Sequence, residues 1–153
     1  MPMIQKNLQT ERPSWDNIWM HFAKSISTRS IDPRFKVGAI VVSEDNTQVL
    51  SVGYNGDQAG GLNEVESIEP GLSGCIHAEI NALIKLDYNN PKFKKMYVTL
   101  SPCKMCAKAI INAGIDEVIY GELYRDTSGA DLLKTSKTVV RYHDESLNCL
   151  DIY

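Results

Sequence analysis

The 153-residue chain lacks any apolar run of membrane-spanning length, and its first residues contain no hydrophobic stretch of signal-peptide length. It also lacks a basic block, because 16 Lys and Arg residues stand against 19 Asp and Glu residues and give a net charge of −3. Proteins that bind nucleic acids usually present a basic face. From these absences we expect a soluble, cytoplasmic protein that contacts neither membranes nor nucleic acids.

Cysteine is scarce as well. The four cysteines, Cys75, Cys103, Cys106 and Cys149, are too few and too unevenly spaced for a disulfide framework. In a reducing compartment, a close pair such as Cys103 and Cys106 is better explained by metal binding or catalysis. The cysteines therefore indicate chemistry rather than cross-linking.

The overall composition is that of an average globular protein, with 43% hydrophobic and 23% charged residues. A chain of this length can build one domain with a substantial core, but it is too short for two ordinary domains. It contains no internal repeat, low-complexity tract or linker. We therefore predict a single domain over residues 1–153, with its core over 14–142 and a C-terminal tail over 143–153.

The pattern of apolar residues predicts strands that alternate with helices. Strands are expected over residues 37–42, 49–54, 96–100, 115–120 and 138–142, and helices over residues 14–29, 76–87 and 129–135. A fourth helix is expected between Ser101, its N-cap, and Gly114, just past its end. Residues 55–74 are rich in glycine and lack periodicity, so we predict a long loop there, and such loops tend to be functional. The alternation implies an α/β fold with a sheet covered on both faces.

Two of these helices carry further local signals. Ser14 is placed to cap the helix over 14–29. In the helix over 76–87, one apolar face is formed by Ile76, Ile80, Leu83 and Ile84.

Two short segments hold residues that can bind a metal ion. Cys103 and Cys106 lie three residues apart at a predicted helix start, so both thiols can reach one ion. His77 opens another helix and adds a nitrogen ligand. One imidazole and two thiolates suit zinc, and three protein ligands leave the fourth tetrahedral position to water, as in catalytic zinc sites. The positive end of a helix also favours the thiolate form of cysteine.

Glu79 completes this group. Residues two apart in the middle of a helix point to nearly opposite sides, but at the first turn His77 and Glu79 can both reach past the helix end. His77 can then bind the metal while Glu79 addresses the metal-bound water without being a ligand. The motif H-x-E followed by P-C-x-x-C is the known signature of zinc-dependent nucleobase deaminases.

Two other interpretations of the cysteine pair, a redox pair and a structural zinc site, explain the sequence less completely than a catalytic zinc site does. A thioredoxin-like redox pair would follow the first strand of its fold, and it would give His77 and Glu79 no role. A structural zinc site would need a fourth protein ligand, and the spare thiols are Cys75, expected to pack beside the helix start, and Cys149, in a polar tail. We therefore favour a catalytic zinc site.

Residues 15–142 resemble the cytidine and deoxycytidylate deaminase superfamily, and within it the dCMP deaminases. The motifs H-A-E at 77–79 and P-C-x-x-C at 102–106 are shared across that superfamily and specify the chemistry. The segments R-S-I-D-P at 29–33 and G-Y-N-G at 53–56 are the ones that point to dCMP deaminases.

The resemblance implies a three-layer α/β/α sandwich around a five-stranded mixed sheet, whose first two strands form an antiparallel hairpin. It implies one catalytic Zn²⁺ per chain, held by His77, Cys103 and Cys106, which lowers the pKa of a bound water. Glu79 would take the water proton, pass it to the pyrimidine ring nitrogen and later protonate the leaving amine. The product would be dUMP with ammonia, which makes the chain a hydrolase of pyrimidine deoxynucleotide metabolism on the route to dTMP.

The resemblance also implies substrate contacts. Asn55 would bind the deoxyribose 3′-hydroxyl, although the residue could instead serve as a turn position with positive φ. The backbone amide of Ala78 would hold the base carbonyl, and the backbone carbonyl of Ser101 would receive the amine.

A 5′-phosphate needs cations around it. Arg29, Arg34 and Lys36 flank the first predicted strand and are the nearest candidates in the sequence. Tyr120 and Tyr124 are candidates for the opposite wall of the site.

Regulation and assembly follow from the same resemblance. dCMP deaminases are commonly homo-oligomers, with a hexamer favoured here, and respond to dCTP and dTTP with Mg²⁺ through the loop after G-Y-N-G. In this chain Gln58 stands where the family usually has proline, although Gly60 is kept. Some members hold a second zinc ion through a cysteine at the position of Asp32, and this aspartate argues against that site.

Three rival functions remain open. A tRNA adenosine deaminase would also contain V-T-L-x-P-C-x-M-C, but the acidic balance and R-S-I-D-P count against it. A free cytidine deaminase usually has cysteine where His77 stands. A catalytically silent nucleotide-binding regulator could retain the zinc site, and the intact Glu79 argues against this.

Overall fold

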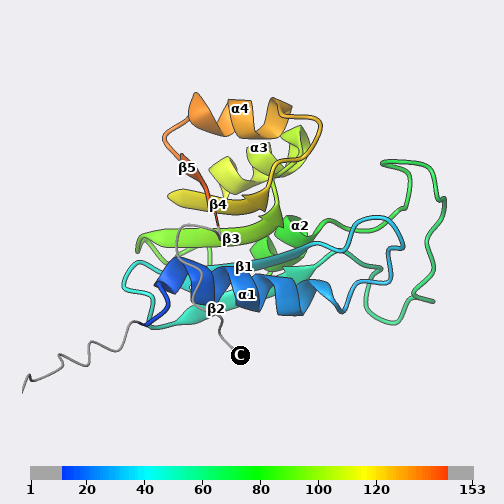
Figure 1. The fold of residues 1–153 in the computed structure, drawn as a ribbon, viewed down its shortest axis with the longest axis horizontal. Helices are drawn as coiled ribbons and strands as arrows, with labels where there is room; N and C mark the ends of the chain where they lie inside the picture. Colours follow the sequence, from blue (N-terminus) through cyan, green and yellow to red (C-terminus); the bar gives the residue numbers. More distant parts are fainter. Residues whose placement is uncertain (1–11, 145–153) are drawn as a thin grey trace, which may run out of the picture.

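The computed structural model describes residues 12–144, which form four helices and five strands (Figure 1). In chain order these are α1 (Trp15–Ser27), β1 (Gly38–Ser43), β2 (Val49–Tyr54), α2 (Ala78–Leu83), β3 (Lys94–Leu100), α3 (Lys104–Asn112), β4 (Glu117–Glu122), α4 (Ser128–Lys134) and β5 (Val139–Tyr142). Within this range no helix is long and apolar enough to cross a membrane. The predicted tail lies outside the described residues after its first two positions.

The strands form one sheet in the order β2-β1-β3-β4-β5. β1 runs antiparallel to both β2 and β3, whereas β3, β4 and β5 are parallel. The predicted mixed sheet and its antiparallel hairpin are therefore confirmed. A consequence of this topology is that β2, β3 and β4 all run in the same direction, so their carboxyl ends meet at one edge of the sheet.

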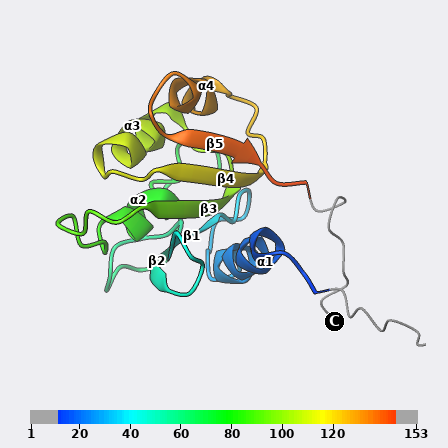
Figure 2. The same ribbon diagram turned by 90° about the vertical axis from the view of Figure 1, so that its left-hand side faces the viewer.

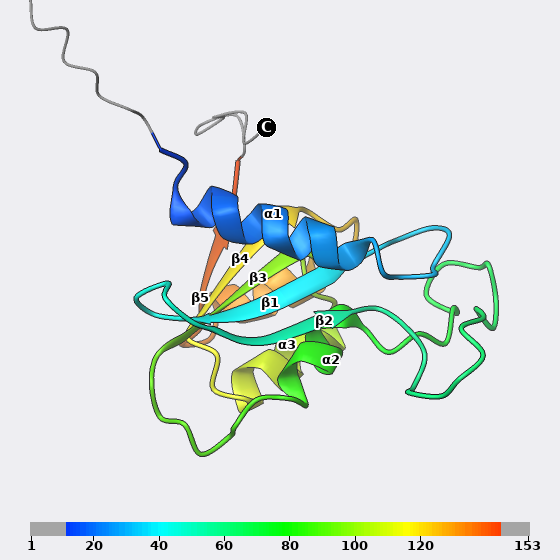
Figure 3. The same ribbon diagram turned by 90° about the horizontal axis from the view of Figure 1, so that it is seen from below.

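The two faces of the sheet are covered by different helices (Figures 2 and 3). In the described part of the chain, α1 packs on one face, where Met20 and Ala23 contact a cluster that includes Ile40 and Tyr97. α2, α3 and α4 cover the opposite face and enclose the larger cluster, which includes Val41. Neighbouring residues of a strand point to opposite faces, so β1 contributes to both clusters and is buried from Gly38 to Val42. The predicted three-layer sandwich is confirmed.

The start of α1 is capped and tied to the sheet. As predicted, Ser14 caps the helix, since its Oγ accepts a hydrogen bond from the backbone N–H of Asn17 at 3.1 Å. In the first turn, Asp16 accepts a hydrogen bond of 2.6 Å from the Tyr97 hydroxyl of β3 and forms an ion pair of 3.1 Å with Arg141 of β5. These bonds join α1 to two strands that are far from it in the sequence.

The second helix differs from its prediction. The helix expected over 76–87 is shorter, and its apolar face is only partly buried, because Leu83 packs against the core whereas Ile84 is 69% exposed and Ile76 is 36% exposed. The buried residues of α2 are Ala78, Glu79 and Ala82.

A glycine of β2 explains this choice of small residues. A Cβ atom at Gly53 would lie 2.3 Å from the carbonyl oxygen of Ala78 and 2.5 Å from the backbone nitrogen of Ala82. The backbones of β2 and α2 therefore approach too closely for branched side chains between them. The Asn81 side chain reinforces the contact by donating a hydrogen bond of 2.8 Å to the carbonyl of Tyr54.

The start of the third helix also differs from its prediction. The N-cap of α3 is Cys103 and not Ser101, because the Cys103 Sγ accepts a hydrogen bond from the backbone N–H of Cys106 at 3.4 Å. The Ser101 hydroxyl is engaged elsewhere, since it accepts a hydrogen bond of 2.7 Å from the backbone N–H of Tyr124. Gly114 follows the helix with a φ of 76°, the conformation expected of a glycine at that position.

The long loop predicted over 55–74 is confirmed, and it continues to the start of α2. Gly56 and Ile76 exchange two backbone hydrogen bonds of 3.0 and 2.8 Å across its base. Figure 1 shows the loop projecting from the end of the molecule at which α2 begins.

Candidate metal centre and substrate cavity

Three metal-ligating side chains meet where α2 and α3 begin. His77 is the N-cap of α2, Cys103 is the N-cap of α3, and Cys106 lies in the first turn of α3. The His77 Nδ1 atom is 3.2 Å from the Cys106 Sγ and 3.5 Å from the Cys103 Sγ. All three ligand atoms lie within 4.8 Å of one another.

These separations suit a tetrahedral zinc ion. With Zn–N distances of about 2.0–2.1 Å and Zn–S distances of about 2.3 Å, tetrahedral angles place nitrogen and sulfur about 3.5 Å apart. Within residues 12–144, this group contains no fourth His, Cys, Asp or Glu ligand. One imidazole and two thiolates therefore fit a zinc ion that keeps one position for water.

The electrostatics of the two thiols differ. Hydrogen bonds from Cys106 and His77 lower the pKa of Cys103 to about 4. The pKa of Cys106 is raised, because its thiol donates to Cys103 and is buried. The hydrogen bond to Cys103 also raises the pKa of His77. Since metal ligands must be deprotonated, zinc binding to this group releases protons.

Glu79 lies beside this group and is only 4% exposed. Burial raises the pKa of its carboxyl to about 7. His77 and Glu79 line the same cavity although they are two residues apart, because both lie at the start of α2. A buried carboxyl in such a place can act as a general acid and base.

The cavity above these residues lies at the edge where three strands end. Asn55 follows β2, Ser101 follows β3, and Tyr124 lies just beyond β4, and all three line the cavity together with Ala78. The common direction of β2, β3 and β4 therefore brings together residues that are far apart in the sequence. This is the usual place for ligands in open α/β sheets.

Four of the predicted contact residues do not line this cavity, and one of them is Arg29, whose guanidinium lies 5.9 Å from the Tyr54 ring centroid. Tyr120 is 8% exposed and belongs to the core beneath α2 and α3, where its ring lies 5.6 Å from that of Tyr142. Its prediction as a wall residue is corrected, because the side chain points into the sandwich. Arg34 donates a hydrogen bond of 3.0 Å to the carbonyl of Ile68, and neither it nor the exposed Lys36 lines the cavity.

The Asn55 side chain is partly engaged by the protein. Its Nδ2 donates a hydrogen bond of 2.7 Å to the Phe35 carbonyl, and its Oδ1 accepts one of 2.8 Å from the Val37 N–H. Among the described residues, the non-glycine positions with positive φ are Asn46 and Asn63. The alternative role of Asn55 as a positive-φ turn residue is therefore wrong. One amide hydrogen and one oxygen lone pair are left for a ligand.

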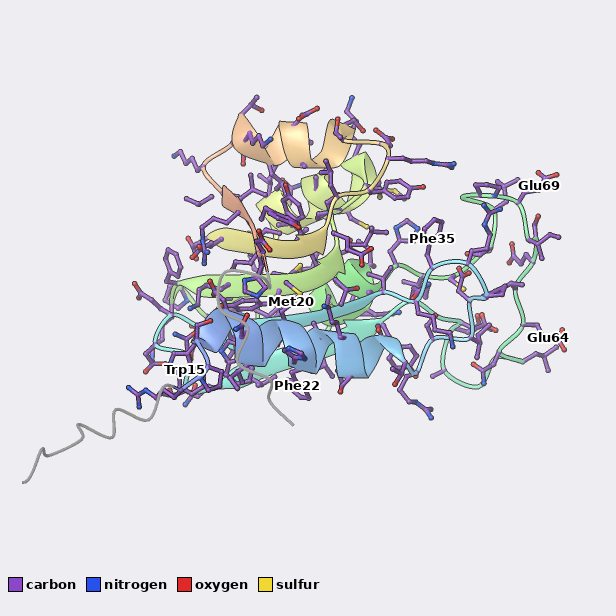
Figure 4. The ribbon with its side chains drawn as sticks, viewed as in Figure 1. Trp15, Met20, Phe22, Phe35, Glu64 and Glu69 are labelled. Carbon is purple, nitrogen blue, oxygen red and sulfur yellow. The ribbon has the colours of Figure 1, made fainter. Side chains whose placement is uncertain are left out.

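Two aromatic residues, Phe35 and Tyr124, form part of the cavity wall. Tyr124 was predicted from the sequence, whereas Phe35 was not identified. The Phe35 ring meets the edge of the Tyr124 ring, with centroids 6.0 Å apart. Figure 4 shows Phe35 between the sheet and the loop that carries Glu64 and Glu69. The Arg125 guanidinium, also missed, lies 5.8 Å from the Tyr124 ring centroid. The sequence held no signal for the Phe35–Tyr124 pair, because it joins segments almost 90 residues apart.

A second hollow lies within the long loop. Its lining includes the carboxylates of Asp57, Glu64 and Glu66 together with Gln58 and Gly60. Among residues 12–144, no lysine or arginine lines this hollow. A triphosphate bound there would gain no direct ion pair from these lining side chains.

Comparison with known proteins agrees with this geometry. Residues 13–122 match the family model of the cytidine and deoxycytidylate deaminase zinc-binding region. Human deoxycytidylate deaminase is 35% identical over 125 residues, which cover 76% of this chain and 70% of the human protein. ComE operon protein 2 of Bacillus subtilis is 36% identical over 121 residues, which cover 75% of this chain and 63% of that protein. The fold is also similar to the crystal structure of dCMP deaminase from the cyanophage S-TIM5 in complex with dCMP and dUMP, with a TM-score of 0.76 and 33% sequence identity. The matched region covers 88% of this chain and 100% of the phage chain.

Proposed function

Because the chain belongs to the cytidine and deoxycytidylate deaminase family, we propose that it is a zinc-dependent enzyme that hydrolyses dCMP to dUMP and ammonia. The observation that carries this proposal is the convergence of His77, Cys103 and Cys106, with the buried Glu79 beside them in one cavity. The choice of nucleotide is supported by the likeness to the phage enzyme solved with dCMP and dUMP.

The residues divide the chemistry between them. When bound by His77, Cys103 and Cys106, Zn²⁺ lowers the pKa of water from nearly 16 to about 7. Glu79 accepts the proton from the attacking water and delivers it to the pyrimidine ring nitrogen. Glu79 then takes the second proton from the new C4 hydroxyl and passes it to the amine, so that ammonia leaves as the C4 carbonyl of dUMP forms. Because Glu79 is buried, bulk water does not compete for these protons.

Three groups of the cavity orient the base and sugar in this proposal. Ala78 is the first residue of α2, and the first N–H groups of a helix have no partner within it, so this amide can donate to the base carbonyl. Ser101 offers its backbone carbonyl to the amine. Asn55 uses its remaining amide hydrogen to bind the 3′-hydroxyl.

The 5′-phosphate must be met at the rim, because no lysine or arginine of the described chain lines the cavity. Arg34 and Arg125 can be compared as alanine variants, with KM measured for dCMP and for deoxycytidine. Loss of the phosphate partner should raise the KM for dCMP about tenfold, since a charge-assisted hydrogen bond contributes about 1.5–3 kcal/mol. The KM for deoxycytidine should be unchanged. A variant that alters both substrates equally does not mark the phosphate contact.

A substrate panel tests the proposed function. The zinc-loaded protein is incubated with dCMP, dCTP, deoxycytidine, cytidine and an adenosine-containing tRNA anticodon stem, and released ammonia is measured. We expect dCMP to be turned over most efficiently. Turnover of the tRNA without turnover of dCMP would make the chain a tRNA adenosine deaminase. No turnover of any substrate would instead favour the silent nucleotide-binding regulator.

Regulation, assembly and location stay predictions. Among the described residues, the hollow of the long loop would meet a triphosphate with carboxylates and no cationic side chain, so control by dCTP and dTTP through this hollow would depend on the Mg²⁺. Adding each nucleotide with Mg²⁺ to the dCMP assay tests it, and a flat response to both would remove it. The homo-hexamer, the cytoplasmic location and the place on the route to dTMP rest on the family alone.

A further inference from the structure

The segment that connects β3 to α3 is supported from one side by the connection between β4 and α4. Ser101, at the start of this segment, is 3% exposed and donates its backbone N–H to the carbonyl of Glu122 at 2.8 Å. Its hydroxyl accepts the 2.7 Å hydrogen bond from the N–H of Tyr124. The zinc-ligand candidate Cys103 lies two residues further on, so any shift of this support moves its backbone.

The closest contact comes from Gly129 in the first turn of α4. A Cβ atom there would lie 1.9 Å from the carbonyl oxygen of Pro102 and 2.6 Å from the carbonyl carbon of Cys103. Contacts under 3.0 Å essentially never occur for real Cβ atoms. Even one methyl group would therefore push α4 and the Pro102–Cys103 backbone apart.

Nothing in the local backbone calls for a glycine at this place. Gly129 is not among the glycines with positive φ, and glycine is less favourable than alanine inside a helix. The reason for this residue is the space it leaves to the neighbouring segment.

Cys103 and Cys106 depend to different degrees on the contact between α4 and the β3–α3 connection. Cys106 is fully buried within α3, next to Ala107 and Ile110 of the core cluster, so its helix holds it. Cys103 precedes the helix and is only half-buried. Its thiol is tied to α3 by the capping hydrogen bond from the Cys106 N–H, and its backbone is held by the residues that pack on the β3–α3 connection.

We propose that Gly129 is a positioning residue for the metal ligand Cys103. The first turn of α4 rests directly on the Pro102–Cys103 backbone and thereby holds the Cys103 Sγ at the distance from His77 that a shared zinc ion needs. This inference rests on the proposed function insofar as that function requires zinc at these residues. It adds α4, which contributes no ligand, to the parts of the fold that determine metal affinity.

The test compares Gly129→Ala with Gly38→Ala. A Cβ at Gly38 would meet a carbonyl oxygen equally closely, 2.0 Å from Ala23 of α1, but on the other face of the sheet. Zinc affinity is measured on each full-length protein by competition with a chromogenic chelator. Cobalt(II) is then substituted, and the thiolate-to-cobalt and d–d absorption bands are recorded. Thermal stability is measured in parallel.

We expect Gly129→Ala to weaken zinc binding at least tenfold and to alter the cobalt bands. Gly38→Ala should lower thermal stability but keep wild-type zinc affinity and cobalt bands. Unchanged metal binding in Gly129→Ala, or equal weakening in both variants, would overturn the inference. A wild-type protein that binds no zinc would instead overturn the proposed function.

A second variant decides the question if Gly129→Ala does not fold. Ser101→Ala removes the acceptor for the Tyr124 N–H without adding any atom. It should weaken zinc binding several-fold and shift the cobalt bands. Wild-type affinity and bands in Ser101→Ala would show that the β4–α4 connection does not position the metal ligand.

Discussion

The two faces of the sheet carry different tasks. The face under α1 is held by Met20, Ala23 and the bonds of Asp16, and none of these residues lines the cavity. The opposite face carries α2 and α3, and the candidate metal ligands and Glu79 lie at the starts of these two helices. Among the described residues, the candidate site thus lies at one edge of one face, whereas the residues named on the other face contribute packing and hydrogen bonds. Changes on the two faces should therefore separate activity from stability.

Removal of zinc is expected to have the largest effect on activity. A chelator should abolish ammonia release, and added Zn²⁺ should restore it. Both tryptophans, Trp15 and Trp19, lie on α1, so their fluorescence reports on the face without the metal site. We expect their emission to be unchanged after chelation. A large change would show that the two faces are coupled.

Substitution of Glu79 should be nearly as severe. Glu79→Gln keeps the size of the side chain but removes the group that transfers protons, so kcat should fall about 10²–10⁴-fold. Zinc content should stay near one ion per chain, measured by atomic absorption. Loss of zinc in this variant would mean that Glu79 is a ligand.

A pair of glycine substitutions compares the faces directly. Gly53→Ala pushes β2 away from α2, and Gly38→Ala pushes β1 away from α1. Each should lower the free energy of unfolding by about 1–3 kcal/mol, the usual cost of overpacking. Only Gly53→Ala should also lower kcat/KM for dCMP, because α2 carries Glu79 and follows His77. Equal activity in the two folded variants would contradict the division of tasks.

The smallest effect on activity is expected for Asp16→Asn. Burial raises the pKa of Asp16, but the hydrogen bonds from Arg141 and Tyr97 lower it by more, so the folded-state pKa lies below the ordinary value of 3.8. A lowered pKa in the folded state contributes stability that is present above the unfolded-state pKa and is lost as the pH falls through the folded-state pKa. Urea unfolding of the wild type should therefore show a loss of stability below about pH 4 to which Asp16 contributes.

In Asp16→Asn that contribution should disappear, and the free energy of unfolding at pH 7 should fall by about 1–3 kcal/mol. The kcat and KM for dCMP at pH 7 should match the wild type. A loss of activity without a loss of stability would place α1 in the catalytic machinery.

Local patterns in the sequence were sufficient to identify several features. The strands β1 and β2, the cap at Ser14 and the turn at Gly114 follow from residues within one element. The spacing of Cys103 and Cys106 likewise brings two thiols to one side of a helix start, and the structure places His77 next to them. In each case the physical cause acts over a few residues, so the chain segment itself carries the information.

Other features were decided by the packing of distant segments. Ser101 does not cap α3, because its hydroxyl is used by Tyr124 of another strand end. Tyr120 points into the core, and α2 buries alanines instead of isoleucines.

Local motifs in the sequence were enough to identify the groups that can hold zinc and transfer protons. Which residues surround these groups was decided by the tertiary structure. Gly53 and Gly129 illustrate this. At each position glycine is needed because a Cβ atom would lie less than 3.0 Å from the backbone of another segment. Such close approaches depend on where strands and helices lie in space, and no pattern of neighbouring residues encodes them.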